Sequence, residues 1–142
     1  MAAPSSLWAF EGRWRLHRRI THASGRGNGT FEGEARFTRS GQMLIHDEAG
    51  VLTIEGAAQG MQATRRYLWR AEKDWIAIAF DDGRPFHAFP AGVVDPEATH
   101  LCTPDRYEVR YDFARWPEWT AVWRVTGPRK DYEMTSQLAP AD

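Results

Sequence analysis

Arg18 is the residue in this sequence that most clearly suggests chemistry. It follows Trp14 by four residues in a strand-like alternation, so an inward Trp14 carries Arg18 to the same side. A buried arginine needs a carboxylate partner, because an unpaired buried charge is very costly. Glu48 and Asp81 are the plausible partners. The pattern therefore favours a structural ion pair made by Arg18.

In the competing interpretation, Arg18 binds a small, partly apolar and anionic ligand. An arginine fork binds a carboxylate bidentately, and aromatic walls enclose an apolar body. Arg65 or Arg110 would assist it, together with a tyrosine. The predicted binding set comprises Arg18, Glu48, Arg65, Tyr67, Trp69, His87, Tyr111 and Trp123. The strand register decides this prediction, since a slip of one residue would turn each of these side chains outward.

The same residue types permit an enzyme of the isomerase or decarboxylase type. Glu48 or His87 would serve as the general base and Tyr67 or Tyr111 as the acid, each with a shifted pKa. The sequence contains no Gly-x-Ser-x-Gly motif and no phosphate-binding loop. It therefore favours a non-catalytic binding protein and leaves the enzyme open. A protein-interaction module with outer aromatic side chains is a third alternative.

Metal and haem sites have weaker support. His87, His100 and Cys102 offer the imidazole and thiolate groups that suit zinc. Their spacing lacks the paired ligands that make such motifs specific. We therefore expect no metal site and no cofactor, with haem held through one histidine as the remaining alternative.

Charge and length limit the partners. The 18 Lys and Arg residues nearly cancel the 19 Asp and Glu residues. Such a chain has no overall field that attracts nucleic acid or an anionic membrane, so we expect neither partner. A length of 142 residues is usual for one domain, and we expect residues 1–142 to form one. The oligomeric state stays open between monomer and dimer.

The expected compartment is the cytoplasm. The single cysteine, Cys102, cannot form an internal disulfide, which fits a reducing environment. The first six residues have neither the basic nor the apolar region of a secretory signal. No apolar run approaches the roughly 20 residues that cross a bilayer.

Turn residues recur at short intervals and separate segments of period-two alternation, which indicates β structure. Strands are predicted over 12–22, 30–39, 42–54, 62–70, 75–81, 84–89, 99–102, 106–115, 119–126 and 129–138. The glycine of Ala49-Gly50 suggests a kink or bulge. Asp82-Gly83 predicts a type I′ hairpin turn. Only residues 4–10 suggest a helical turn, with Ser5 or Ser6 as its N-cap.

Eight to ten strands joined by tight turns predict an all-β, antiparallel, up-and-down barrel. Closure hides the two edges that an open sheet would expose. A sandwich would need longer crossover connections, and only 90–96 could provide one. A barrel of this size is either filled by its side chains or holds one small ligand. The seven Trp and seven Phe residues fit a sheet and permit such a cavity.

Gly12-Arg13-Trp14, at the start of the first predicted strand, resembles the Gly-x-Trp signature of the calycin superfamily. The resemblance implies a lipocalin-like barrel in which Trp14 plugs the closed end. It also implies that an arginine from a late strand stacks on this tryptophan, a contact worth roughly 0.5–2 kcal/mol. Arg124 or Arg129 would supply that arginine here.

Longer motifs resemble a family of short, uncharacterised bacterial proteins over nearly the whole chain. They are Asp-Asp-Gly-Arg-Pro-Phe-His at 81–87, His-x-Cys-x-Pro-Asp at 100–105 and Gly-Pro-Arg-Lys-Asp-Tyr at 127–132. The resemblance implies a lipocalin-like barrel and no assigned activity, so it transfers no catalytic residue. The favoured interpretation of 127–132 is a structural latch, in which charges of Arg129 and Asp131 join neighbouring strands.

Overall fold

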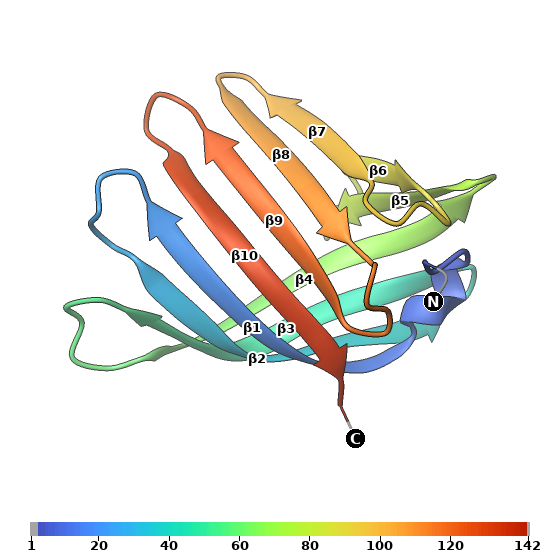
Figure 1. Ribbon diagram of the computed structural model, residues 1–142, viewed down its shortest axis with the longest axis horizontal. Helices are drawn as coiled ribbons and strands as arrows, with labels where there is room; N and C mark the ends of the chain where they lie inside the picture. The colour runs from blue at the N-terminus through green and yellow to red at the C-terminus, as the bar shows by residue number, and fades with distance from the viewer. Residues whose placement is uncertain (1–2, 142) are drawn as a thin grey trace.

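The computed structural model describes residues 3–141 as ten antiparallel strands preceded by one short helical turn (Figure 1). The helical turn, η1, spans Leu7–Phe10. The strands are β1 (Gly12–His22), β2 (Gly29–Ser40), β3 (Met43–Ile54), β4 (Met61–Glu72), β5 (Trp75–Phe80), β6 (Pro85–Pro90), β7 (Glu97–Cys102), β8 (Asp105–Asp112), β9 (Trp119–Thr126) and β10 (Asp131–Pro140). Among these residues no helix is long and apolar enough to span a membrane.

The strands form one sheet that curls into a nearly closed barrel. Their order is β6-β5-β4-β3-β2-β1-β10-β9-β8-β7, so strands that are consecutive in the chain are neighbours, except β6 and β7, and β1 also pairs with β10 (Figure 1). Within the described residues, the edge strands β6 and β7 are not hydrogen-bonded to each other. Aromatic packing of Phe86 against His100, with ring centroids 5.3 Å apart, bridges them instead. The predicted all-β, up-and-down barrel is confirmed.

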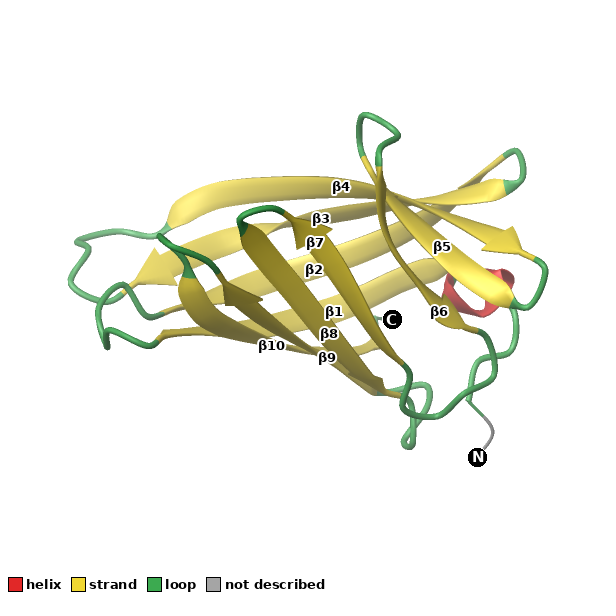
Figure 2. Cartoon of the chain, turned by 90° about the horizontal axis from the view of Figure 1, so that it is seen from above, coloured by secondary structure: helices red, strands yellow, loops and turns green. Residues whose placement is uncertain are grey.

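Turn η1 lies at one end of the barrel (Figure 2), and its residues Leu7 and Phe10 belong to the same buried core cluster as Trp14. The Ser6 hydroxyl caps η1 by accepting a hydrogen bond from the Trp8 amide at 3.2 Å. Phe10 is fully buried, and its carbonyl accepts a hydrogen bond from Trp14 Nε1 at 2.9 Å. Trp14 also packs against the ring of Trp119. The predicted first strand therefore begins at a helical turn that seals the core.

Neither arginine expected to stack on Trp14 does so. Arg124 lies between the inward residues of β9 and therefore points to the outer face. There it pairs with Asp131 and donates to the carbonyl of Tyr132 at 3.0 Å. Arg129 lies in the turn before β10, at the opposite end of that strand from Trp14, which pairs with Pro140. The predicted cation–aromatic contact is therefore wrong, because alternation turns Arg124 outward and the turn that holds Arg129 lies too far from Trp14.

The hairpin at Asp82-Gly83 is present, but its turn is not type I′. Gly83 has a φ of +88°, whereas Asp82 is not among the positive-φ residues. The Gly83 amide donates to the carbonyl of Phe80, and the Phe80 amide donates to the carbonyl of Arg84, each at 2.9 Å. These bonds enclose a three-residue loop ending in a left-handed glycine, accompanied by a register shift between β5 and β6.

Glycines allow β2 and β3 to approach closely where a kink or bulge was expected. Gly33 pairs with Gly50 in a continuous register, without a bulge. A Cβ atom added to Gly33 would lie 2.1 Å from the carbonyl oxygen of Ala49. The absence of side chains, rather than an extra residue, therefore accommodates the curvature of the sheet here.

The strand predicted over 106–115 is shorter in the structure, because β8 ends at Asp112.

Candidate functional site

The barrel encloses a cavity of about 360 Å³. All eight residues of the predicted binding set line it: Arg18, Glu48, Arg65, Tyr67, Trp69, His87, Tyr111 and Trp123. They come from β1, β3, β4, β6, β8 and β9. Their inward direction follows from the observed register, whereas their role in binding stays a prediction. Arg110 lies instead on the outer surface, because its neighbours Val109 and Tyr111 point inward.

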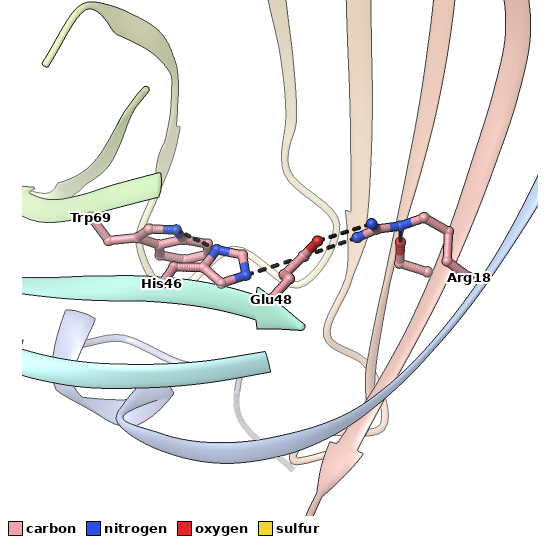
Figure 3. A network of polar contacts seen from close by, with 5 residues as sticks. Arg18, His46, Glu48 and Trp69 are labelled. Carbon is pink, nitrogen blue, oxygen red and sulfur yellow. Dashed lines mark hydrogen bonds and ion pairs between the residues drawn. The ribbon is translucent and has the colours of Figure 1, made fainter. Parts of the chain in front are cut away.

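A buried ion pair crosses the cavity wall from β1 to β3 (Figure 3). Both terminal nitrogens of Arg18 donate to the two carboxylate oxygens of Glu48 at 2.9 Å. The third nitrogen, Nε, donates to the hydroxyl of Ser136 at 2.7 Å. The partner of Arg18 is therefore Glu48 and not Asp81. With its charge neutralised by Glu48 and each of its three nitrogens already hydrogen-bonded, Arg18 is poorly placed to bind a second carboxylate.

His46 and Trp69 extend this network on the other side of Glu48 (Figure 3). The indole Nε1–H of Trp69 donates to His46 Nδ1 at 3.0 Å. Because an indole nitrogen is only a donor, Nδ1 carries the lone pair and the proton of the neutral ring sits on Nε2. That nitrogen lies 3.2 Å from Glu48 Oε2. Sequence reasoning missed His46, although it stands two residues before Glu48 and hence on the same face.

The network keeps Glu48 ionised. Burial by itself raises the pKa of this carboxyl, but the contact with His46 and the charge of Arg18 outweigh burial and hold the pKa below its ordinary value. The pKa of Arg18 is raised in turn, because the attraction of Glu48 exceeds the effect of burial. A carboxylate with so low a pKa is a weak general base near neutral pH.

His87 and Tyr111 form a second polar pair in the cavity wall. His87 Nε2 lies 2.7 Å from the Tyr111 hydroxyl. Burial, with a smaller contribution from His100, lowers the pKa of His87 to about 3. Burial also raises the pKa of Tyr111, so both groups are neutral at pH 7. Such a pair is suited to neutral hydrogen bonding and poorly suited to acid–base catalysis near pH 7.

Acid is expected to destabilise the protein through His87. The unfolded histidine takes up a proton below pH 6.5, whereas the folded one resists protonation until about pH 3. The free energy of unfolding therefore decreases as the pH falls through that window, by about 2 kcal/mol at pH 5. Urea unfolding of the wild type and of His87→Phe at pH 8 and pH 5 measures this. The variant should lose less stability than the wild type over this interval, and equal losses would contradict a neutral, buried His87.

Cationic and phenolic side chains gather near Tyr132 in the cavity lining. Lys130 donates to the Tyr107 hydroxyl at 2.8 Å and lies 3.0 Å from the Asp105 carboxylate, and both contacts raise its pKa. Burial raises the pKa of Tyr132, while the charges of Lys130 and Arg65 oppose that rise. The two cations therefore act on the same hydroxyl.

The latch expected at 127–132 is present in part. Asp131 pairs with Arg124 of the neighbouring strand β9, as expected, whereas Lys130 rather than Arg129 makes the contact to β8 through Tyr107. Sequence reasoning left several cavity-lining residues out of the binding set: His46, Phe86, Tyr107, Lys130, Tyr132 and Ser136. Tyr107 shares the alternation of Tyr111 and could have been found from it. The strand predicted over 129–138 includes Lys130, but β10 begins at Asp131, so Lys130 lies in a turn, where alternation gives no direction.

The weak metal candidates do not converge on a site. Cys102 is exposed, and His100 packs against the rings of Phe80 and Phe86. Over residues 3–141, no group of three or more His, Cys, Asp or Glu side chains is arranged to hold a metal ion. A metal role for these residues therefore receives no support from their geometry.

The comparisons with known proteins address the family and the fold. The profile of a family of unknown function, DUF6314, matches residues 10–140. No curated protein matches the sequence. An S-type phycobiliprotein lyase from Guillardia theta matches with a TM-score of 0.65 and 8% identity, over 96% of this chain and 90% of the lyase.

Two further solved structures also match. A protein of unknown function of the DUF3598 family from Nostoc punctiforme has a TM-score of 0.58 and 6% identity, over 96% of this chain and 49% of its own. A redesigned β-barrel bound to DFHBI has a TM-score of 0.48 and 15% identity, over 94% and 97% of the two chains, and we draw nothing from it. At these identities the lyase and the DUF3598 protein show a shared barrel fold.

Proposed function

This chain belongs to DUF6314, a family of unknown function, and from its cavity we propose that it binds a small, partly apolar, anionic molecule inside the barrel. The cavity carries this proposal. Its volume of about 360 Å³ lies within the range of small-molecule sites. The fold is also that of a phycobiliprotein lyase, so it is compatible with a role beyond a purely structural one.

Aromatic walls provide the apolar part of the proposed site. The rings of Phe86 and Trp123 lie nearly parallel, with centroids 5.0 Å apart. Phe80 stacks on Phe86 at 4.4 Å. These three side chains, from β5, β6 and β9, line the same cavity as the cations Arg65 and Lys130. A ligand with an apolar body and an acidic group would satisfy both parts of this lining.

The protonation states of the side chains that line the cavity favour a binding function over a catalytic one. The alternative, a barrel enzyme, needs a base and an acid whose pKa values lie near the working pH. The pKa of His87 is about 3, and that of Glu48 is also depressed. The pKa of Tyr111 is shifted upward, away from neutral pH. These groups are better suited to holding a ligand than to exchanging protons with it.

Native mass spectrometry of the freshly purified protein and thermal unfolding with 2-naphthoate, indole-3-acetate and decanoate test this function. A ligand present at about 100 times its Kd should stabilise the fold by about 2.7 kcal/mol and raise the unfolding midpoint by roughly 10 °C. Ala121→Phe, which fills the cavity lining, should abolish the shift, whereas Ala71→Phe at an exposed position should retain it. The absence of any bound mass and of any shift would refute the proposed function.

A further inference from the structure

The cavity contains one cation whose charge is not balanced by the protein. Three side chains that are cationic at pH 7 line it: Arg18, Arg65 and Lys130. Glu48 neutralises Arg18 with two hydrogen bonds, and Asp105 lies 3.0 Å from the Lys130 ammonium. Within residues 3–141, Arg65 has no carboxylate within 4.0 Å, the distance that defines an ion pair. Its charge is therefore available to an external anion.

Arg65 stands where the cavity opens through the barrel wall. Strand β5 pairs with β4 only from Tyr67 to Glu72, so the first half of β4 has no β5 partner. A wider surface hollow lies over this gap, lined in part by the turn between β5 and β6. Four side chains line both this hollow and the interior cavity: Glu48, Arg65, Tyr67 and Phe80.

The direction of Arg65 follows from the register of β3 and β4. Arg65 pairs directly with Glu48, and paired residues on adjacent strands share a face. Arg65 is nevertheless exposed, whereas Glu48 is buried. The positive charge of Arg65 opposes the rise that burial causes in the pKa of the Tyr67 phenol. A tyrosine hydroxyl of this kind can donate its O–H to an anion.

We propose that Arg65, assisted by the Tyr67 hydroxyl, binds the carboxylate of a monoanionic aromatic acid in this opening, with the ring system directed inward toward Phe86 and Trp123. This assignment rests on the proposed function and specifies its ligand. The planar guanidinium matches a carboxylate with two parallel hydrogen bonds. A single uncompensated cation balances one negative charge.

A dianion such as a phosphate monoester fits this opening less well. Arg65 would balance only one of its two negative charges. The second would lie near the carboxylates of Glu48 and Asp81, which line the same hollow. Like charges in a partly desolvated site repel one another strongly. The ligand class is therefore a monocarboxylate rather than a phosphate.

Isothermal titration calorimetry with 2-naphthoate, 2-naphthalenemethanol and 2-naphthyl phosphate tests this assignment. Wild-type protein should bind the carboxylate at least about tenfold more tightly than the neutral alcohol, as expected for a charge-assisted hydrogen bond. Arg65→Gln should remove that preference while leaving affinity for the alcohol. Arg66→Gln is the matched control, since Arg66 is the next residue and pairs outside with Asp47 at 2.7 Å. Arg66→Gln should retain the preference.

The outcomes separate this assignment from the proposed function. A carboxylate preference that survives in Arg65→Gln would overturn the role of Arg65 and leave a binding barrel. Tighter binding of the phosphate than of the carboxylate would overturn the ligand class. Failure of all three compounds to bind the wild type, with an unchanged unfolding midpoint, would count against the proposed function itself.

Discussion

Replacing Glu48 with glutamine is expected to lower the free energy of unfolding by about 3–5 kcal/mol, because it leaves the guanidinium of Arg18 without a counter-charge in the barrel. Only 6% of the Glu48 side chain and 19% of the Arg18 side chain are exposed. Urea unfolding at pH 7 measures the loss. Since the pKa of Glu48 is depressed, its stabilisation is complete above the ordinary value of 4.5 and declines below it. The difference between the two proteins should therefore shrink in acid.

Asp47→Asn is the matched control for this change. Asp47 precedes Glu48 and accepts two hydrogen bonds from Arg66, at 2.7 and 3.2 Å, but on the exposed face. Its loss should cost less than about 1 kcal/mol, because water screens a surface pair. The double variant Arg18→Met with Glu48→Leu removes both charges and should be more stable than Glu48→Gln. Equal losses for Glu48→Gln and Asp47→Asn would contradict the structural importance of the inner pair.

Phe10→Ala is expected to destabilise the protein by about 3–5 kcal/mol, since it empties the sealed end of the barrel. Phe10 has no exposed surface. Its ring centroid lies 5.1–6.1 Å from those of Phe37, Trp69, Phe113, Trp116 and Trp119. None of these rings can collapse into the vacated space without losing its other contacts. Urea unfolding, with circular dichroism as the signal, measures the loss.

Two comparisons distinguish a cavity from a general loss of aromatic surface. Trp75→Ala removes a larger ring, but 49% of Trp75 is exposed, so the expected cost is about 1 kcal/mol or less. Benzene should raise the unfolding midpoint of Phe10→Ala, because an apolar cavity in a protein core binds such a molecule. The same benzene concentration should leave the wild type unchanged. An equal loss for both variants would show that η1 does not seal the core.

The candidate site was predictable to the extent that strand alternation fixes the direction of a side chain. Arg65, Tyr67 and Trp69 share one phase of β4, and all three line the cavity. Alternation could not identify the partner of Arg18, because Glu48 and Asp81 were both compatible with the pattern. The choice depends on how β1 and β3 are brought together across β2, which is a property of the assembled sheet.

Details of turns and of side-chain direction decided which of the local predictions were correct. The hairpin between β5 and β6 followed from Asp82-Gly83, but its turn type depended on a third loop residue and on the register shift beside it. The contacts made by Lys130 could not be predicted, because it lies in a turn before β10 and not in the strand that was expected to begin at residue 129. The stacking expected on Trp14 failed because Arg124 faces outward, and aromatic rings fill that end of the barrel instead.

The sequence by itself determined an all-β meander with an inward stripe of apolar, cationic and phenolic side chains, because the pleat of a strand is a local property that repeats every two residues. Only the tertiary structure decided which charges cancel. Ion pairing depends on distances between strands that are remote in the chain, and these distances place Glu48 on Arg18 and Asp105 on Lys130 while leaving Arg65 unneutralised at the opening.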